Sequence, residues 1–149
     1  MRRFQYPVTL TREREGGFTV RFADLPEAIT SGADRQDALA QAADCLEEAV
    51  AGRIADGLEI PPPSSSRRNP RRKQVLVAVP APTAAKAALY LAMREAGIKN
   101  TELARRLGCD EKEVRRMLDP RHPTKLPRIQ QALEALGKRL VVAMEEEAA

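Results

Sequence analysis

Three charged residues in the second half of the chain have the types and spacing of groups that read DNA bases. Lys112 and Arg115 are three residues apart in an expected helix and share one of its faces, and Glu111 opens that helix. Lysine or arginine donates to guanine N7 and O6, whereas a carboxylate accepts from cytosine N4. The pattern predicts base contacts in the major groove, with a solvated charged helix face as the alternative.

Other polar side chains around this helix suit the phosphate backbone. Asn100 and Thr101 open the preceding expected helix, where backbone N–H groups and polar side chains meet phosphate. Arg116, Arg121 and Lys125 add cations beyond the base-reading face. The candidate DNA-binding residues are therefore Asn100, Thr101, Glu111, Lys112, Arg115, Arg116, Arg121 and Lys125.

A tight turn between two short helices, residues 100–118, must position these groups. Gly108 suits a turn with positive φ, and the Asp110 carboxylate can cap the second helix. A small residue four positions before Gly108 and an apolar one six positions after it complete the helix-turn-helix spacing. The expected buried contacts are Ala104, Leu107, Val114 and Leu118. An ordinary helical hairpin, which also uses glycine in its turn, is the structural alternative.

Two further helices are expected around this pair. Pro80 and Pro82 exclude a helix before Thr83, which is expected to cap a helix that ends at Gly97. Apolar residues from 126 to 136 then predict another helix. Apolar segments at residues 74–79 and 140–144 predict two short flanking strands that pair with each other, within one chain or between two.

The first sixty residues follow a different pattern. Apolar residues alternate over residues 4–10 and 18–22, a short third strand is expected from residue 28, and Gly32 ends it. Asp34 with Asp37 predicts the capped start of a long amphipathic helix that covers the sheet. Residues 58–60 are a candidate final strand. The order is therefore β-β-β-α, with or without that last strand.

Charge divides the chain in the same way. Residues 1–60 carry 7 Lys and Arg against 11 Asp and Glu, whereas residues 61–149 carry 18 against 10. The basic part suits a polyanion such as DNA, and the acidic part suits a basic protein. The expected α+β organisation is an N-terminal domain at 1–60, a Pro/Ser/Arg linker at 61–73 and a helical domain at 74–149. Five cations at residues 67–73 form an arm or a solvated tether.

Residue content argues against an enzyme. The single histidine, His122, lies between Arg121 and a proline, and no nucleophile, acid and base come together in the pattern. Two cysteines and one histidine at unrelated spacing do not suggest a zinc site, and there is no phosphate loop. No cofactor is expected. The absence of a long apolar run or a leader-like start favours a cytoplasmic protein with free thiols.

Two groups of motifs, in order, resemble the HicB antitoxin family over roughly residues 4–144. The first group is Tyr6-Pro7-Val8, Gly16-Gly17, Phe22-Ala23-Asp24-Leu25-Pro26, Gly32 and the helix containing Ala38. The second is LARRLGCDEKEVRRML, which resembles the helix-turn-helix carried by one branch of that family. One departure is Lys99-Asn100, where the family has a small polar cap, so the cap is expected at Asn100.

The resemblance implies properties that residue patterns alone do not. It implies a partial ribonuclease-H-like N-terminal domain that holds a HicA toxin, a small basic mRNA-cleaving ribonuclease. It also implies a C-terminal domain that binds the promoter of its own operon, and a homodimer or higher oligomer. Because the chain lacks a recognisable set of ribonuclease-H carboxylates, nuclease activity is not expected. The leading hypothesis is an antitoxin and autorepressor; the alternative is a stand-alone transcriptional regulator whose N-terminal domain senses a ligand.

Overall fold

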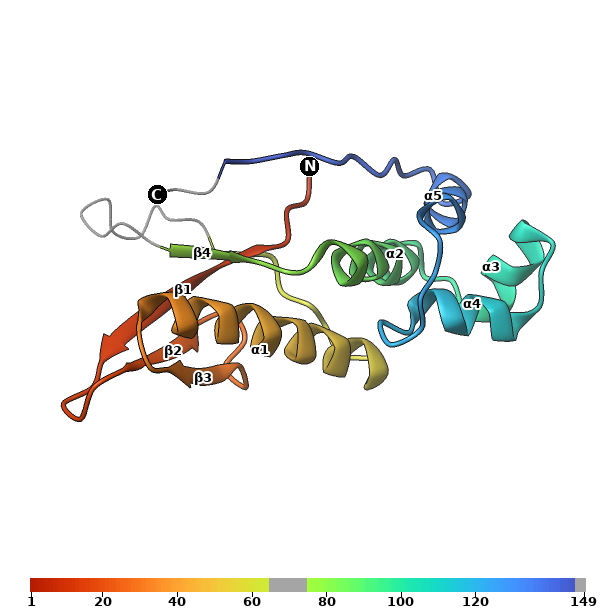
Figure 1. Ribbon diagram of the computed structural model, residues 1–149. Coiled ribbons are helices and arrows are strands. Elements are labelled where there is room, and N and C mark those ends of the chain that lie inside the picture. The colour runs from red at the N-terminus through yellow and green to blue at the C-terminus, as the bar shows by residue number, and fades with distance from the viewer. Residues whose placement is uncertain (65–74, 147–149) are drawn as a thin grey trace.

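The computed structural model describes residues 1–64 and 75–146 of the 149-residue chain. The expected cation cluster at 67–73, and with it most of the expected linker, lies outside the described residues. A sheet and one long helix form from the first part of the chain together with a strand that follows the linker, and four shorter helices complete the fold (Figure 1). The expected α+β fold class is confirmed.

The sheet is antiparallel, with its strands in the order β3-β2-β1-β4. Its members are β1 (Gln5–Arg12), β2 (Phe18–Phe22), β3 (Ile29–Gly32) and β4 (Val75–Ala78). Alternate residues of the two central strands, Tyr6 and Val8 with Val20 and Phe22, are buried against α1 (Arg35–Ala55). The period-two pattern therefore identified the inner face of the sheet correctly.

Helix α1 begins where its sequence predicts. The Asp34 carboxylate accepts from the Asp37 N–H at 2.8 Å, and the Asp37 carboxylate accepts from the Ala33 N–H at 2.8 Å. Two backbone donors at the start of the helix are thereby satisfied. Its buried residues recur at every fourth position and are Ala38, Ala42, Leu46, Val50 and Ile54. The small ones lie at the β3 end, where the helix approaches the sheet closely.

The candidate strand at residues 58–60 does not form. The segment from Gly57 to Pro61 instead uses its five consecutive carbonyls as acceptors for side chains. The donors lie in the N-terminal segment, in β1, in α1 and in α2 (Ala81–Ala96). For the carbonyls taken in order from Gly57 to Pro61, they are Arg94, Tyr90, Arg53, Arg2 and Tyr6. Hydrogen bonds that a strand takes from a neighbouring strand thus come here from side chains.

Strand β4 corrects the expected pairing of the two flanking strands. It forms as predicted, but it pairs with β1, with Tyr6 opposite Val77 and Val8 opposite Val75. Residues 140–144 form no strand, and Val141 and Val142 are exposed. The helices are therefore flanked by a strand on one side only, and that strand completes the N-terminal sheet.

Four helices follow: α2 (Ala81–Ala96), α3 (Asn100–Leu107), α4 (Glu111–Leu118) and α5 (Leu126–Glu134). Helix α2 starts before Thr83, which corrects the expected cap there. Pro82 is tolerated because it lies in the first turn, where N–H groups lack helical partners. The Thr83 hydroxyl is buried and donates to the Glu47 carboxylate of α1 at 2.7 Å.

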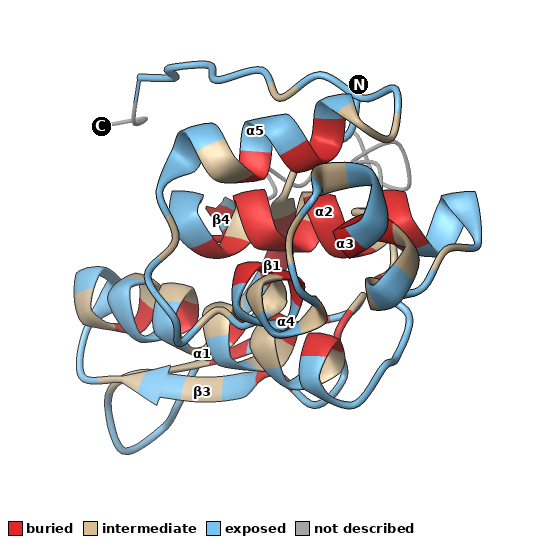
Figure 2. Ribbon diagram, turned by 90° about the vertical axis from the view of Figure 1, so that its right-hand side faces the viewer, coloured by how far each residue is buried: buried red, intermediate tan, exposed pale blue. Residues whose placement is uncertain are grey.

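Helix α2 belongs to both halves of the core. Ala87 and Tyr90 pack with the sheet and α1, whereas Ala85, Leu89 and Met93 pack with α3, α4 and α5. Figure 2 shows buried residues along this helix, which lies between α1 and α5. The division into domains at residues 60 and 74 stays a prediction, and both β4 and α2 make contacts across it.

Candidate nucleic-acid interface

The turn between α3 and α4 has the geometry that its sequence predicts. Gly108 has a φ of 66°, in the left-handed region that favours glycine. The Cys109 N–H donates to the Ala104 carbonyl at 3.0 Å and closes the end of α3. The Asp110 carboxylate accepts from the Glu113 N–H at 2.9 Å and caps α4. The direction in which α4 leaves the turn is therefore determined locally.

The buried contacts of this pair lie close to the expected ones. Ala104 and Val114 are buried, as predicted, and Leu107 and Leu118 are half-buried. Leu103 and Met117, each directly before an expected position, are fully buried as well. The buried face of each helix is thus rotated slightly from the face that the sequence predicted. This rotation leaves the charged side of α4 facing outward.

The candidate base-reading residues lie on that outward side. Lys112, Arg115 and Arg116 are exposed, and Glu111 is half-buried. The Arg115 guanidinium donates to both carboxylate oxygens of Glu111, and the shortest of these hydrogen bonds measures 2.7 Å. Arg115 and Glu111 therefore act as one paired unit, whereas the Lys112 ammonium extends into solvent one helical turn away.

The start of α3 differs from the expectation. Lys99, rather than Asn100, occupies the N-cap position, and it makes no side-chain cap. Asn100 is the first helical residue and is half-buried, while Thr101 is exposed. Because Asn100 has helical backbone geometry, its side chain is free of the capping role that the sequence assigned to it.

The remaining candidates follow α4. Arg121 is exposed in a loop, and its backbone N–H donates to the Asp119 carboxylate at 2.9 Å. Lys125 is exposed and is the N-cap residue of α5. Both cations thus lie on the segment that leads from the end of α4 to α5.

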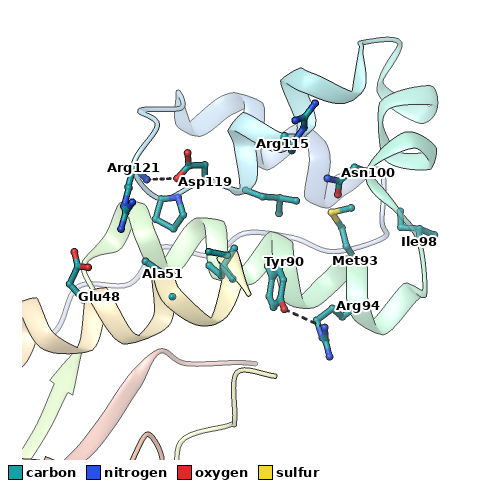
Figure 3. Close-up of a pocket in the computed structure, with 15 residues that line it drawn as sticks. Glu48, Ala51, Tyr90, Met93, Arg94, Ile98, Asn100, Arg115, Asp119 and Arg121 are labelled. Carbon is teal, nitrogen blue, oxygen red and sulfur yellow. Dashed lines mark hydrogen bonds between the residues drawn. The ribbon is translucent and has the colours of Figure 1, made fainter. Parts of the chain in front are cut away.

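A hollow of about 610 Å³ brings three of these residues together. It opens between α1, α2 and α4, and Asn100, Arg115 and Arg121 line it together with Glu48 and Tyr90 (Figure 3). The Arg115 side chain points away from α1, while Arg121 lies at the end of the hollow nearer Glu48. Thr101, Glu111, Lys112, Arg116 and Lys125 do not line this hollow.

One carboxylate on α3 has a strongly perturbed acidity. Glu102 accepts from Arg105 at 2.7 Å and from Arg106 at 3.0 Å. Hydrogen bonds from Arg105 and Arg106 lower the pKa of Glu102 to about 2. Because folding lowers the pKa of Glu102, this residue contributes stability to the folded chain above pH 4.5. That contribution is lost as the pH falls through about 2.

We expect this acidity to be measurable directly. The side-chain carboxyl of Glu102, followed by NMR, should titrate at about pH 2 in the folded chain and near 4.5 in the urea-unfolded chain. Replacing Arg105 and Arg106 by glutamine should return the pKa of Glu102 in the folded chain most of the way to 4.5. A folded wild-type midpoint near 4.5 would show that the two arginines do not hold Glu102.

Sequence patterns missed two contacts that hold α4 in place. The Arg128 guanidinium of α5 reaches the Glu113 carboxylate at 2.8 Å and joins the two helices. Lys86 of α2 is buried and donates to carbonyls at and beyond the end of α4. The only sequence signal for the Lys86 contacts is a single charged residue in the otherwise apolar stretch of residues 84–93.

Comparison with known proteins assigns the family. A family model described as "HicB_like antitoxin of bacterial toxin-antitoxin system" matches residues 5–88, which span the sheet, α1 and the start of α2. The chain belongs to the HicB-like antitoxin family. The resemblance noted in the sequence is thereby confirmed, and the chain is an antitoxin of a toxin–antitoxin system.

Relatives of the HicB family match nearly the whole chain. Antitoxin HicB 2 of Photorhabdus laumondii is 41% identical over 91% of this chain and 93% of its own length. Antitoxin HicB of Escherichia coli strain K12 is 38% identical over 94% of this chain and 99% of its own length. Antitoxin HicB of Pseudomonas fluorescens is 31% identical over 95% of this chain and 94% of its own length. The likeness to HicB antitoxins therefore extends through α2 to α5, beyond the region of the family model.

Two negative observations apply to the described part of this HicB-family chain. Across residues 1–64 and 75–146, no helix is long and apolar enough to cross a membrane. In the same residues, no three His, Cys, Asp or Glu side chains gather as a metal site requires. Cys45 and Cys109 are free and half-buried, and burial raises the pKa of both thiols.

Proposed function

We propose that the chain binds a small HicA-type mRNA-cleaving toxin and neutralises it by covering its RNA-binding or catalytic surface. Membership of the HicB-like antitoxin family is the observation that carries this proposal. The charge of the N-terminal part supports it, because 11 acidic against 7 basic residues attract a protein built to bind RNA. The chain acts in this role by binding, as a cytoplasmic regulator rather than as an enzyme.

The test is a cleavage assay with the toxin gene's product from the same operon. Cleavage of an mRNA by the toxin should fall in proportion to added chain and stop at a fixed stoichiometric ratio. A heat-unfolded sample of the chain is the control for non-specific RNA protection. Cleavage that continues at a large molar excess of folded chain would contradict the proposal.

We also propose that the chain represses its own operon through α3 and α4. The support is the helix-turn-helix geometry at Gly108 and Asp110, together with the exposed cations of α4. In this proposal Lys112 and the Arg115–Glu111 pair read base edges. Phosphates are contacted by Asn100, Thr101, Arg116, Arg121 and Lys125.

Operator recognition of this kind requires at least a homodimer. Two copies place two recognition helices one turn of DNA apart, in successive major grooves. Footprinting of the operon's own promoter should therefore give two protected half-sites with centres about 10 base pairs apart. A single protected half-site, or none on that promoter, would contradict autorepression by a dimer.

The alternative is a stand-alone transcriptional regulator that senses a small ligand. The hollow of about 610 Å³ between α1 and the helix-turn-helix is the feature that such a regulator would use. The two functions differ in their partners. Specific promoter binding without a toxin partner would favour the regulator, and stoichiometric toxin binding would favour the antitoxin.

A further inference from the structure

Lys86 is the one fully buried charged side chain among residues 1–64 and 75–146. It lies in α2 with 2% of its surface exposed, and burial lowers the pKa of its ammonium group. A buried ammonium is unfavourable unless its hydrogen-bond donors all find partners. The partners of Lys86 therefore indicate why the charge is buried here.

Every partner of Lys86 lies at the end of α4 or in the loop that follows. The ammonium donates to the carbonyls of Arg116 at 2.9 Å and Asp119 at 2.7 Å, to the carbonyl of His122, and to the Thr124 hydroxyl at 2.8 Å. Three N–H groups thus serve four oxygen atoms. The Asp119 carboxylate acts on the ammonium by its charge, but no carboxylate accepts a hydrogen bond from it, and three of the four acceptors are backbone carbonyls.

This loop has few hydrogen bonds of its own. Pro120 and Pro123 supply no N–H donor, and the His122 N–H donates to the Asp119 carbonyl at 3.0 Å. The carbonyl of Arg116, in the last turn of α4, accepts from the Asp119 N–H at 3.3 Å and from the Thr124 hydroxyl at 3.4 Å as well as from the ammonium. A cation at that end also interacts favourably with the helix dipole. Lys86 therefore joins the last turn of α4 to residues 119–124.

We propose that Lys86 is a positioning residue for DNA recognition, because it fixes the loop bearing Arg121, and with it Lys125, relative to α4. Phosphate contacts from the loop and base contacts from α4 then occur together without reordering of the loop. The inference rests on the proposed DNA-binding function. Lys86 lies on α2, outside the helix-turn-helix, and touches no DNA itself.

The test compares wild type with Lys86→Met, which fills a similar volume but offers no donor. Binding of the promoter is measured over a range of salt concentrations, well below the unfolding temperature of both proteins. We expect at least a tenfold loss of affinity. We also expect the slope of log K against log salt to flatten by about 2 per protomer, as two phosphate contacts are lost.

Thr83→Val is the matched control, since it removes the other buried polar group of α2, whose partner is Glu47 of α1. It should lower the unfolding temperature and leave the salt slope unchanged. Equal losses of affinity in both variants, with unchanged slopes, would reduce Lys86 to a stability role and overturn the inference.

A milder variant covers the case in which Lys86→Met does not fold. Thr124→Val removes one acceptor of the ammonium, together with the bond from the Thr124 hydroxyl to the Arg116 carbonyl, and should lower affinity roughly two- to fivefold, with a flatter salt slope. An unchanged slope in Thr124→Val would then overturn the inference. Failure of the wild-type chain to bind its promoter would instead contradict the proposed function, so the two failures are distinguishable.

Discussion

Replacing both Lys112 and Arg115 by alanine is expected to lower affinity for the operator about 100-fold or more while leaving the fold intact. Both side chains are exposed on α4, whose buried contacts are made by Val114 and Met117. Each base contact is worth roughly 1–3 kcal/mol of discrimination, and 1.4 kcal/mol is a factor of ten. Binding to unrelated DNA should fall much less, so that specificity is lost.

The matched control removes two cations from a different place. Lys138→Ala with Arg139→Ala makes the same change in charge at exposed positions after α5, where Lys138 pairs with Glu95 of α2. We expect operator affinity to change by less than threefold in this control at moderate salt. Equal losses in the two double variants would show that α4 contributes only general positive charge.

Replacing Gly32 by alanine is expected to destabilise the chain by about 3 kcal/mol, which lowers the melting temperature by about 10 °C. A Cβ at this position would lie 2.2 Å from the Ala38 nitrogen and 2.4 Å from its Cα. Both atoms belong to the first turn of α1, so no side-chain rotation relieves the contact. The helix must move away from β3, and the buried surface of Ala38 and Ala42 is partly lost.

Gly52→Ala, inside α1 itself, is expected to have the opposite effect on stability. No heavy atom lies within 4 Å of a Cβ built at this position, and alanine is the better helix former. We expect a gain of about 0.5–1 kcal/mol. Thermal unfolding followed by circular dichroism at 222 nm measures both variants. A Gly32→Ala protein as stable as wild type would contradict the close approach of α1 to β3.

The helix-turn-helix was predictable because its determinants are local. Gly108 and Asp110 act within a few residues of themselves, through a backbone angle and a cap. The same holds for Asp34 at the start of α1. The expected cap at Thr83 was wrong because its hydroxyl has a distant partner on α1, which no local pattern indicates.

Non-local pairing explains the other errors in the fold. The apolar segment that forms β4 suits any open strand edge, and local sequence does not identify β1 as its partner. Residues 58–60 have the composition of a strand, yet they lie where five side chains reach their backbone carbonyls. Those side chains are spread from Arg2 to Arg94, so only the folded chain reveals the arrangement.

Within the candidate site, sequence indicated which side chains are exposed but not how they are held. The helical period correctly left Lys112 and Arg115 on the outer face of α4. The support for that face comes from Arg128 and Lys86, which lie on two other helices. Lys86 in particular binds carbonyls, which every residue possesses, so nothing in the sequence distinguishes its partners.

Native purification of the chain from its source cell, with every bound protein identified by mass, tests the antitoxin function directly. We expect one small basic protein at a fixed ratio, whose RNA cleavage stops when this chain is added. Recovery of the chain without such a partner, under conditions in which it still binds its promoter, would contradict the antitoxin function. The chain would then be a DNA-binding regulator that shares only its ancestry with the HicB antitoxins.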